Sequence, residues 1–418
     1  GDLQARRDLT IALDNVAGML ETSDPRRALE LYEESLGIRR DLDGRLLGDL
    51  QARRDLTIAL DNVAGMLETS DPRRALELYE ESLGIRRDLD GRLLGDLQAR
   101  RDLTIALDNV AGMLKTSDPG RAVKLYEESL DISRDLDERL SGDLQARRDL
   151  TVALNNVAGM LKNSDPGRAL KLYEDSLDIR RDLDERLSGD LQARRDLTVA
   201  LNNVAGMLKN SDPGRALKLY EDSLDIRRDL AGRLSGDFQA RRDLTVALIN
   251  VAGMLETSDP GRAVKLYEES LGIRRDLDGR LSGDLQARRD LTIALDNVAG
   301  MLKNSDPGRA LGLYEESLGI SRELAAQLPG NLQALWDLGV AAARLAQLLP
   351  TKHPERIPLW REAAISFRDA LAIQPENKEL ARMSCLVALH YADCDPDDRD
   401  EWLAYAAELA ERFGFGKE

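Results

Sequence analysis

An asparagine and its variable neighbour recur in this sequence at intervals of 47 residues. The segment ALDNVAGML at residues 12–20 returns as ALNNVAGML at 153–161 and as ALINVAGML at 247–255. The amide of the invariant asparagine can both donate and accept hydrogen bonds, which matches the N–H and C=O groups along an extended peptide. The chemistry of this position is therefore recognition. Its seven copies are Asn15, Asn62, Asn109, Asn156, Asn203, Asn250 and Asn297.

The residue before each asparagine changes in character along the chain. It is acidic in four copies, an amide in two and apolar in one. Carboxylates beside the asparagines would attract a positive group, so a neutral or basic partner segment is favoured over an acidic one. The residues are Asp14, Asp61, Asp108, Asn155, Asn202, Ile249 and Asp296.

Residue types for catalysis or metal binding are scarce. Residues 1–329 contain neither histidine nor cysteine, which removes His-based acid–base chemistry, thiol nucleophiles and the usual transition-metal ligands. Near the C-terminus, Cys385 and His390 would lie roughly 140° apart around a helix, a poor geometry for sharing a metal. With Cys394 they are expected to be structural. We expect no enzyme activity, no cofactor and no metal site.

Two amphipathic helices must position the asparagines in each copy. The first apolar stripe has helical spacing and comprises Leu9, Leu13, Val16, Ala17 and Leu20. The second comprises Ala28, Leu31, Tyr32, Ser35, Leu36, Leu42 and Leu46. Between them, Ser23-Asp24-Pro25 offers a helix N-cap followed by a proline at the first helical position. At the other junction, Gly48 is expected to end one helix and Asp49 to cap the next.

The 47-residue copies predict an all-α solenoid of antiparallel helix pairs, because one pair alone cannot bury both stripes. Repeats one and two are identical in sequence. We expect a first domain at 1–329, and a second at 330–418 formed by a divergent eighth repeat with C-terminal capping helices. The seven repeats begin at residues 1, 48, 95, 142, 189, 236 and 283.

Charge and composition restrict the partners and the location. The 76 acidic and 59 basic residues give a net charge of −17, which disfavours nucleic acid and anionic membranes. No apolar run reaches the ~20 residues that span a bilayer, and no signal peptide is visible. Two cysteines fit a reducing compartment, so a cytoplasmic location is expected. The chain begins on Gly1 in mid-pattern, which suggests a fragment of a longer protein.

The repeats resemble the tetratricopeptide repeat (TPR) family. RALELYEESL at 27–36 is similar to the second helix of that repeat, with Ala28, Tyr32 and Ser35 at its small, aromatic and small positions. LDNVAGML at 13–20 is similar to the first helix. The unit is longer than the family's standard repeat and is closer to the long kinesin-light-chain type, so both helices are expected to be extended by about two turns. The resemblance implies a right-handed superhelix.

The resemblance also implies a concave groove lined by the first helices. In repeat one its ligand-facing positions are 11, 14, 18, 21 and 22, and four of these five vary among the seven repeats. Related arrays use an asparagine ladder on peptide backbones, which carries that role over to the seven asparagines. Position 21 adds further candidates that change from acidic to basic: Glu21, Lys115, Lys162 and Lys209.

These positions permit two interpretations. Either the groove is altered while the scaffold stays constant, or exposed residues drift, as the exposed stripe at 26, 30, 34 and 37 suggests. The asparagines could likewise bond to a neighbouring helix. The ArgArgAsp runs at 6–8 and 39–41 are interpreted as solvated ion pairs between repeats.

The sequence therefore predicts a module that binds a protein or an extended peptide. The resemblance implies the sensor or adaptor part of a larger bacterial protein. The alternative is a structural spacer that associates with itself.

Overall fold

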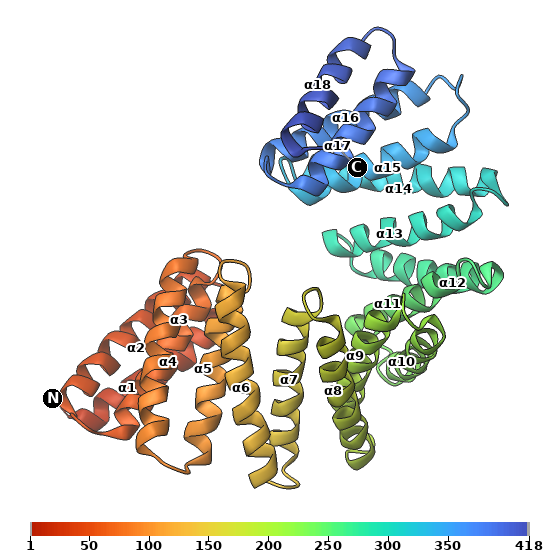
Figure 1. Cartoon of the computed structure of the whole chain (residues 1–418). Coiled ribbons are helices and arrows are strands. Elements are labelled where there is room, and N and C mark those ends of the chain that lie inside the picture. The colour runs from red at the N-terminus through yellow and green to blue at the C-terminus, as the bar shows by residue number, and fades with distance from the viewer. Residues whose placement is uncertain (1, 416–418) are drawn as a thin grey trace. The chain divides into compact units, whose positions relative to one another are not determined.

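The computed structural model describes residues 2–415, and every regular element in that range is an α-helix (Figure 1). The helices are α1 (Leu3–Leu20), α2 (Pro25–Arg45), α3 (Leu50–Leu67), α4 (Pro72–Arg92), α5 (Leu97–Leu114), α6 (Pro119–Arg139), α7 (Leu144–Leu161), α8 (Pro166–Arg186), α9 (Leu191–Leu208), α10 (Pro213–Arg233), α11 (Phe238–Leu255), α12 (Pro260–Arg280), α13 (Leu285–Leu302), α14 (Pro307–Gln327), α15 (Leu332–Leu348), α16 (Arg356–Ile373), α17 (Lys378–Cys394) and α18 (Arg399–Phe413).

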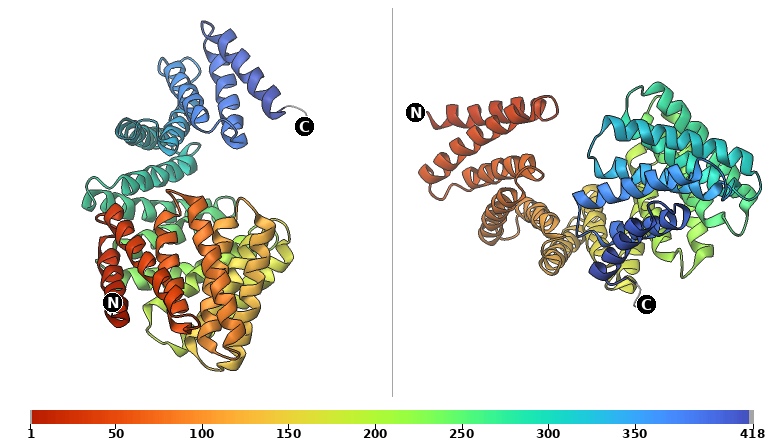
Figure 2. Two further views of the ribbon diagram at one scale, coloured as in Figure 1. Left: turned by 90° about the vertical axis from the view of Figure 1, so that its left-hand side faces the viewer. Right: turned by 90° about the horizontal axis from the view of Figure 1, so that it is seen from above.

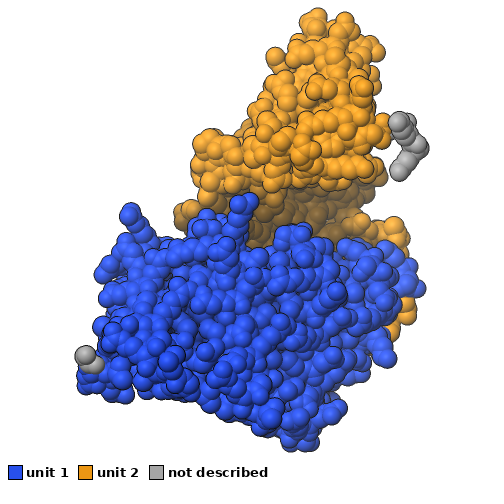
Figure 3. All heavy atoms as spheres, turned by 60° about the vertical axis from the view of Figure 1, so that its left-hand side comes forward, with its two compact units in different colours: residues 1–211 blue, residues 212–418 orange. Residues whose placement is uncertain are grey.

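The chain forms two compact units, residues 1–211 and 212–418 (Figure 3). Within each unit, every helix packs against the helix before it and the helix after it, so helix pairs lie side by side (Figure 2). We call the odd-numbered helices α1 to α15 the A helices and α2 to α14 the B helices. The prediction of an all-α fold of antiparallel helix pairs is confirmed.

Local capping sets the helix boundaries as the sequence predicts, with one difference. The Asp24 carboxylate accepts a hydrogen bond of 3.1 Å from the Arg27 backbone N–H, and Pro25 opens the B helix. The B helix, however, ends before Gly48, because Leu46 is its C-terminal capping residue. Gly48 lies in the following turn with φ of 88°, a conformation that glycine adopts without strain.

Within each unit, an A helix packs closely on the B helix that follows it around a glycine and a tyrosine. A Cβ atom added to Gly65 would lie 3.6 Å from the Tyr79 hydroxyl oxygen, so the absence of a side chain makes room for the tyrosine. Val63, Leu60 and Ser82 are fully buried beside it. Both stripes predicted from the sequence therefore form the core that neighbouring repeats share.

The C-terminal helices fill their core with aromatic rings instead of the repeated small residues. Trp336 and Phe367 meet edge to face with centroids 5.3 Å apart, and Trp360 stacks on His390 at 4.8 Å. Gly339 lets α15 approach α16, since a Cβ there would lie 2.8 Å from Phe367 Cε2. Cys385 is buried, with its Sγ 3.5 Å from the Ala406 carbonyl oxygen.

Repeats one and two provide a direct test of stacking, because their sequences are identical and only the second is covered on both sides. Leu56 is 4% exposed, whereas Leu9, at the same position of repeat one, is 45% exposed. Leu56→Ala is expected to lower the free energy of unfolding by about 2–5 kcal/mol. Leu9→Ala is expected to lower it by less than about 1 kcal/mol. Guanidinium chloride unfolding followed by circular dichroism compares them, and equal losses would contradict stacking as the source of stability.

Candidate functional site

The candidate site is the surface of the A helices that carries repeat positions 11, 14, 15, 18, 19, 21 and 22; we call it the A face. Position 11 places a half-exposed isoleucine or valine on each A helix from α3 to α13, as at Ile58, which is 47% exposed. Positions 14 and 15 follow one turn later and are partly buried in α3 to α13. The A face thus combines an apolar stripe with a stripe of amides and carboxylates.

The asparagines at position 15 are partly exposed in α3 to α13, and Asn15 itself is exposed. Asn156 donates from Nδ2 to Asp108 Oδ2 at 3.3 Å. Among the described residues, the side chains of Asn62, Asn109 and Asn297 have no hydrogen-bond partner. Most of these amides are therefore available to a ligand. The remaining ladder members, Asn203 and Asn250, are partly exposed in the same way.

The aspartates of repeats one and two at position 14 are paired within the protein. Arg39, which is only 6% exposed, donates from Nη2 to Asp14 at 2.6 Å and from Nη1 to the Asp55 carbonyl oxygen at 2.9 Å. Arg86 repeats the arrangement with Asp61, at 2.5 Å. A buried guanidinium thus joins the A helix of its own repeat to that of the next repeat.

This finding corrects the interpretation of the ArgArgAsp run at 39–41. Arg39 is buried, whereas Arg40 is exposed and pairs with Glu81 of the next repeat at 2.6 Å. The run at 6–8 does make ion pairs as expected, with Arg7 reaching Asp49 of the next repeat at 2.8 Å. The exposed pairs contribute little stability, but a buried guanidinium requires its partner.

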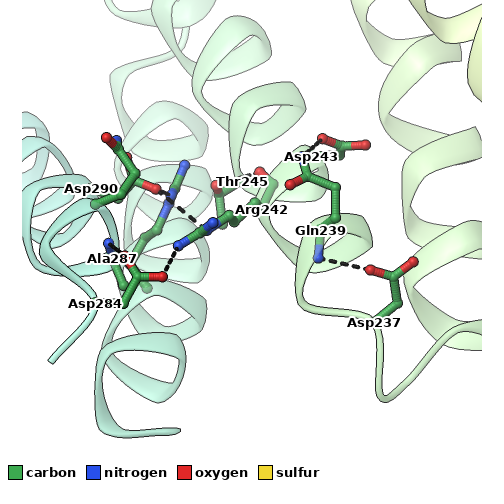
Figure 4. Close-up of polar contacts among 10 residues, drawn as sticks. Asp237, Gln239, Arg242, Asp243, Thr245, Asp284, Ala287 and Asp290 are labelled. Atoms are coloured by element: carbon green, nitrogen blue, oxygen red, sulfur yellow. Dashed lines mark hydrogen bonds and ion pairs between the residues drawn. The ribbon is translucent and has the colours of Figure 1, made fainter. Parts of the chain in front are cut away.

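In repeats four to six position 14 is not acidic, and the buried arginine pairs with a different aspartate. There the buried arginine makes an ion pair with the aspartate at position 8 of the following repeat; the pairs are Arg180–Asp196, Arg227–Asp243 and Arg274–Asp290. Figure 4 shows this junction around Asp290, which Arg242 also approaches, at 3.8 Å. Asn155, Asn202 and Ile249 therefore occur where the arginine has a different carboxylate partner. The Oδ1 atoms of Asn155 and Asn202 are buried without a hydrogen-bond partner.

Repeats three and seven keep the acid but replace the arginine by serine, at Ser133 and Ser321. In repeat seven, Asp296 forms an ion pair with Arg344 of α15 instead of with an arginine at position 39. Asp108 accepts a hydrogen bond of 3.3 Å from Asn156, and no arginine of the described chain pairs with it. Burial raises the pKa of Asp108 to about 6, although hydrogen bonds from Ser129 and Asn156 oppose the shift.

Where position 21 is a glutamate, its carboxylate accepts a hydrogen bond from within the same repeat, as in repeat one. The Tyr32 hydroxyl donates to Glu21 at 2.6 Å, and burial together with this bond raises the pKa of Tyr32. In repeat three the lysine takes a different place, since Lys115 Nζ lies 5.4 Å from the centre of the Tyr126 ring. Lys162 and Lys209 are exposed.

A hollow of about 570 Å³ opens on the A face of the second unit. Its lining includes Asp296, Asn297, Met301, Tyr314 and Arg344. The predicted site positions 14 and 15 of repeat seven thus border one concavity, together with position 15 of repeat eight. Its polar and apolar lining suits a side chain of a bound segment.

Residues 2–415 contain no group of three His, Cys, Asp or Glu side chains that could hold a metal ion. Within the same range, no helix has the length and apolar character needed to cross a membrane.

The buried arginine is the residue that sequence reasoning missed. Arg39 falls on the second apolar stripe, three residues after Leu36 and three before Leu42. Its helical phase could therefore have identified it as buried. A second signal was that positions 14 and 39 never change in the same repeat.

Comparison with known proteins shows which solved structures share this fold. No protein-family model matches the sequence, and no curated protein matches it significantly. Among solved structures, the chain is similar to the apo form of RapI, with 13% identity and a TM-score of 0.58 over 98% of this chain and 99% of that one. It also matches a Rap protein complexed with competence and sporulation factor, with 13% identity and a TM-score of 0.43 over 98% and 97%. The fold is a helical solenoid of TPR-like repeats.

The unusual carboxylate of repeat three predicts a pH-dependent stability. Because the folded pKa of Asp108 is raised to about 6 from 3.8, its ionisation destabilises the fold as the pH rises through that interval, and the penalty is constant above it. Asp108→Asn is therefore expected to stabilise the protein at pH 7.5 by on the order of 2 kcal/mol, and the gain should vanish as the pH falls from 6 to about 4.

Thermal unfolding of the variant and the wild type at several pH values measures this gain. Asp61→Asn is the matched control, and it should not raise Tm at pH 7.5, because Arg86 loses its partner. A gain for Asp108→Asn that does not change with pH would contradict the assignment.

Proposed function

We propose that this chain binds an extended protein or peptide segment along the A face, without catalysing a reaction. In this proposal residues 1–329 provide seven binding repeats of the long, kinesin-light-chain-like kind, and residues 330–418 close the array. The composition and the scarcity of cysteine favour a cytoplasmic setting, where the chain would be the sensor or adaptor part of a larger bacterial protein.

The observation that carries the proposal is the row of partly exposed asparagines at position 15, in which Asn156 bonds Asp108 but Asn62, Asn109 and Asn297 have no hydrogen-bond partner among the described residues. The amides of Asn62, Asn109 and Asn297 are open to water, and a ligand that replaces this water with its own hydrogen bonds would be bound at little cost. A peptide backbone offers a donor and an acceptor at regular intervals, and the half-exposed Ile and Val side chains at position 11 provide apolar contact beside it.

The sequence favours a neutral or basic ligand, and the ion pairs of the structure reduce the number of aspartates that could attract a basic one. Asp14, Asp61 and Asp296 are each neutralised by a guanidinium, so they add little to the attraction of a basic ligand. A neutral segment with a basic residue at one place fits the A face better than a segment that is basic throughout.

Backbone recognition is tested by replacing the ladder in three adjacent repeats. Peptides are selected from a random displayed library on the purified chain, and their affinities are measured for a variant with Asn109→Ala, Asn156→Ala and Asn203→Ala. A loss of at least about ten-fold is expected, since each lost hydrogen bond is worth about 1 kcal/mol.

The matched control carries Asp131→Ala, Asp178→Ala and Asp225→Ala, which are exposed positions on the B helices of the same repeats. This control should bind like the wild type. If the asparagine variant also binds like the wild type, or if its Tm falls while its affinity holds, the asparagines are not the peptide readers.

Self-association is a second candidate, because near-identical repeats present the same side chains at regular intervals and could contact a second copy of the chain. Light scattering over a concentration series tests it: the mass should double as the concentration rises. A chain that stays monomeric excludes it.

A further inference from the structure

Repeat three differs from every other repeat in lacking a cation for its buried acid. Where position 14 is an aspartate, an arginine pairs with it in three cases, namely Arg39, Arg86 and Arg344. Where position 14 is neutral, the arginine has moved to another aspartate. Only Asp108, among the described residues, keeps a buried carboxylate at position 14 without a guanidinium, because Ser133 stands in the place of Arg39.

The loss of the arginine opens the junction between α5, α6 and α7. Thr104 is partly exposed, whereas the threonine at the same position is buried in the other six repeats. The side chain of Asp149 is 35% exposed, compared with 22% for its counterpart Asp196, which has its buried arginine. Water therefore reaches groups that the guanidinium covers elsewhere.

Two carboxylates hold the repeat positions that the buried arginine bonds in other repeats. Asp108 corresponds to the acid that Arg39 bonds in repeat one, and Asp149 corresponds to the acid that Arg180 bonds one junction later. Arg101 approaches Asp149 only at 3.8 Å, and Lys115 is held over the Tyr126 ring. The local cations thus leave Asp108 without a direct ion-pair partner.

Repeat seven shows that such a place accepts a guanidinium from outside the repeat. There Ser321, Asp296 and Asp337 line a hollow of about 180 Å³, and Arg344 of the following A helix enters it to pair with Asp296. The residue of repeat four at the position of Arg344 is Asn156, which is too short and carries no charge. Repeat three keeps the serine and both aspartates found at this place in repeat seven, but no arginine pairs with its Asp108.

We propose that Asp108, with Ser133 and Asp149, forms a receptor for one lysine or arginine side chain of the segment bound on the A face. The proposal rests on the proposed function, and it assigns the basic residue of the ligand to repeat three. The guanidinium or ammonium group would take the place that Arg39 and Arg86 fill in the first two repeats. Because the receptor must be ionised, binding should weaken below about pH 6, the pKa of Asp108.

The methionines give one reporter per repeat for a direct test. Met301 lines the larger hollow, of about 570 Å³, which also includes Asp296. Met113 is the counterpart of Met301 in repeat three. The full chain labelled at the methionine methyl groups is titrated with N-acetyl-argininamide, and with N-acetyl-glutaminamide as a neutral probe, at constant ionic strength. The Met113 signal should shift saturably with the cationic probe, and the neutral probe should bind at least about ten-fold more weakly, the loss expected when a charged partner is removed.

Two variants remove the receptor in different ways. Ser133→Arg supplies the internal guanidinium of repeats one and two, and Asp108→Asn installs the amide found at Asn155 and Asn202. Both should abolish the saturable shift at Met113. Ser321→Arg makes the same change in repeat seven, and it should leave the Met113 response as in the wild type.

The outcomes separate the inference from the proposed function. A wild-type Met113 signal that ignores N-acetyl-argininamide, or responds equally in Ser133→Arg, overturns the receptor even if library peptides bind. If the probe binds at repeat three but no peptide is selected on the A face, the receptor stands and the peptide-binding proposal fails. If the probe binds at repeat three and peptides bind the A face, peptides selected on the wild type should share a basic residue at one position. Peptides selected on Ser133→Arg should lack it.

Discussion

The guanidinium buried between neighbouring repeats is the interaction on which the chemistry of the A face depends. Taking such a charge out of water is costly unless carboxylates or carbonyl oxygens surround it. Arg39 meets this requirement by bonding Asp14 of its own repeat and the Asp55 carbonyl of the next. In repeats one and two the arginine therefore ties two A helices together, whereas in repeats four to six it pairs with an aspartate of the next A helix.

This constraint explains the variation at position 14. An aspartate can become asparagine or isoleucine without leaving an arginine unpaired, provided that the arginine finds the aspartate at position 8 of the next repeat, as Arg180 and Arg274 do. Conversely, replacing the arginine by serine leaves the aspartate in need of another cation. The ion-pair partner of the residue at position 14 thus depends on the residue at position 39.

The side chains at positions 11 and 15, on either side of position 14, make fewer hydrogen bonds and ion pairs within the protein than position 14 does. The asparagines at position 15 and the apolar residues at position 11 change little or not at all, yet many of them remain partly exposed. Under the proposed function, an extended peptide backbone would bond these amides at regular intervals, beside the half-exposed aliphatic side chains. Specific recognition would then come from the places where the arginine pattern is broken.

The sequence by itself determined the helices, their pairing and the core, because periodic leucines, alanines and tyrosines, with Asp-Pro and Gly-Asp punctuation, act through local and nearest-neighbour contacts. It also located the position 14 and 15 residues on the first helix of each pair. The tertiary structure alone decided which of their charges are neutralised, since Arg39 reaches Asp14 from another helix, and Arg344 reaches Asp296 from another repeat. Such pairings depend on distances across packed helices, which no spacing along one helix specifies.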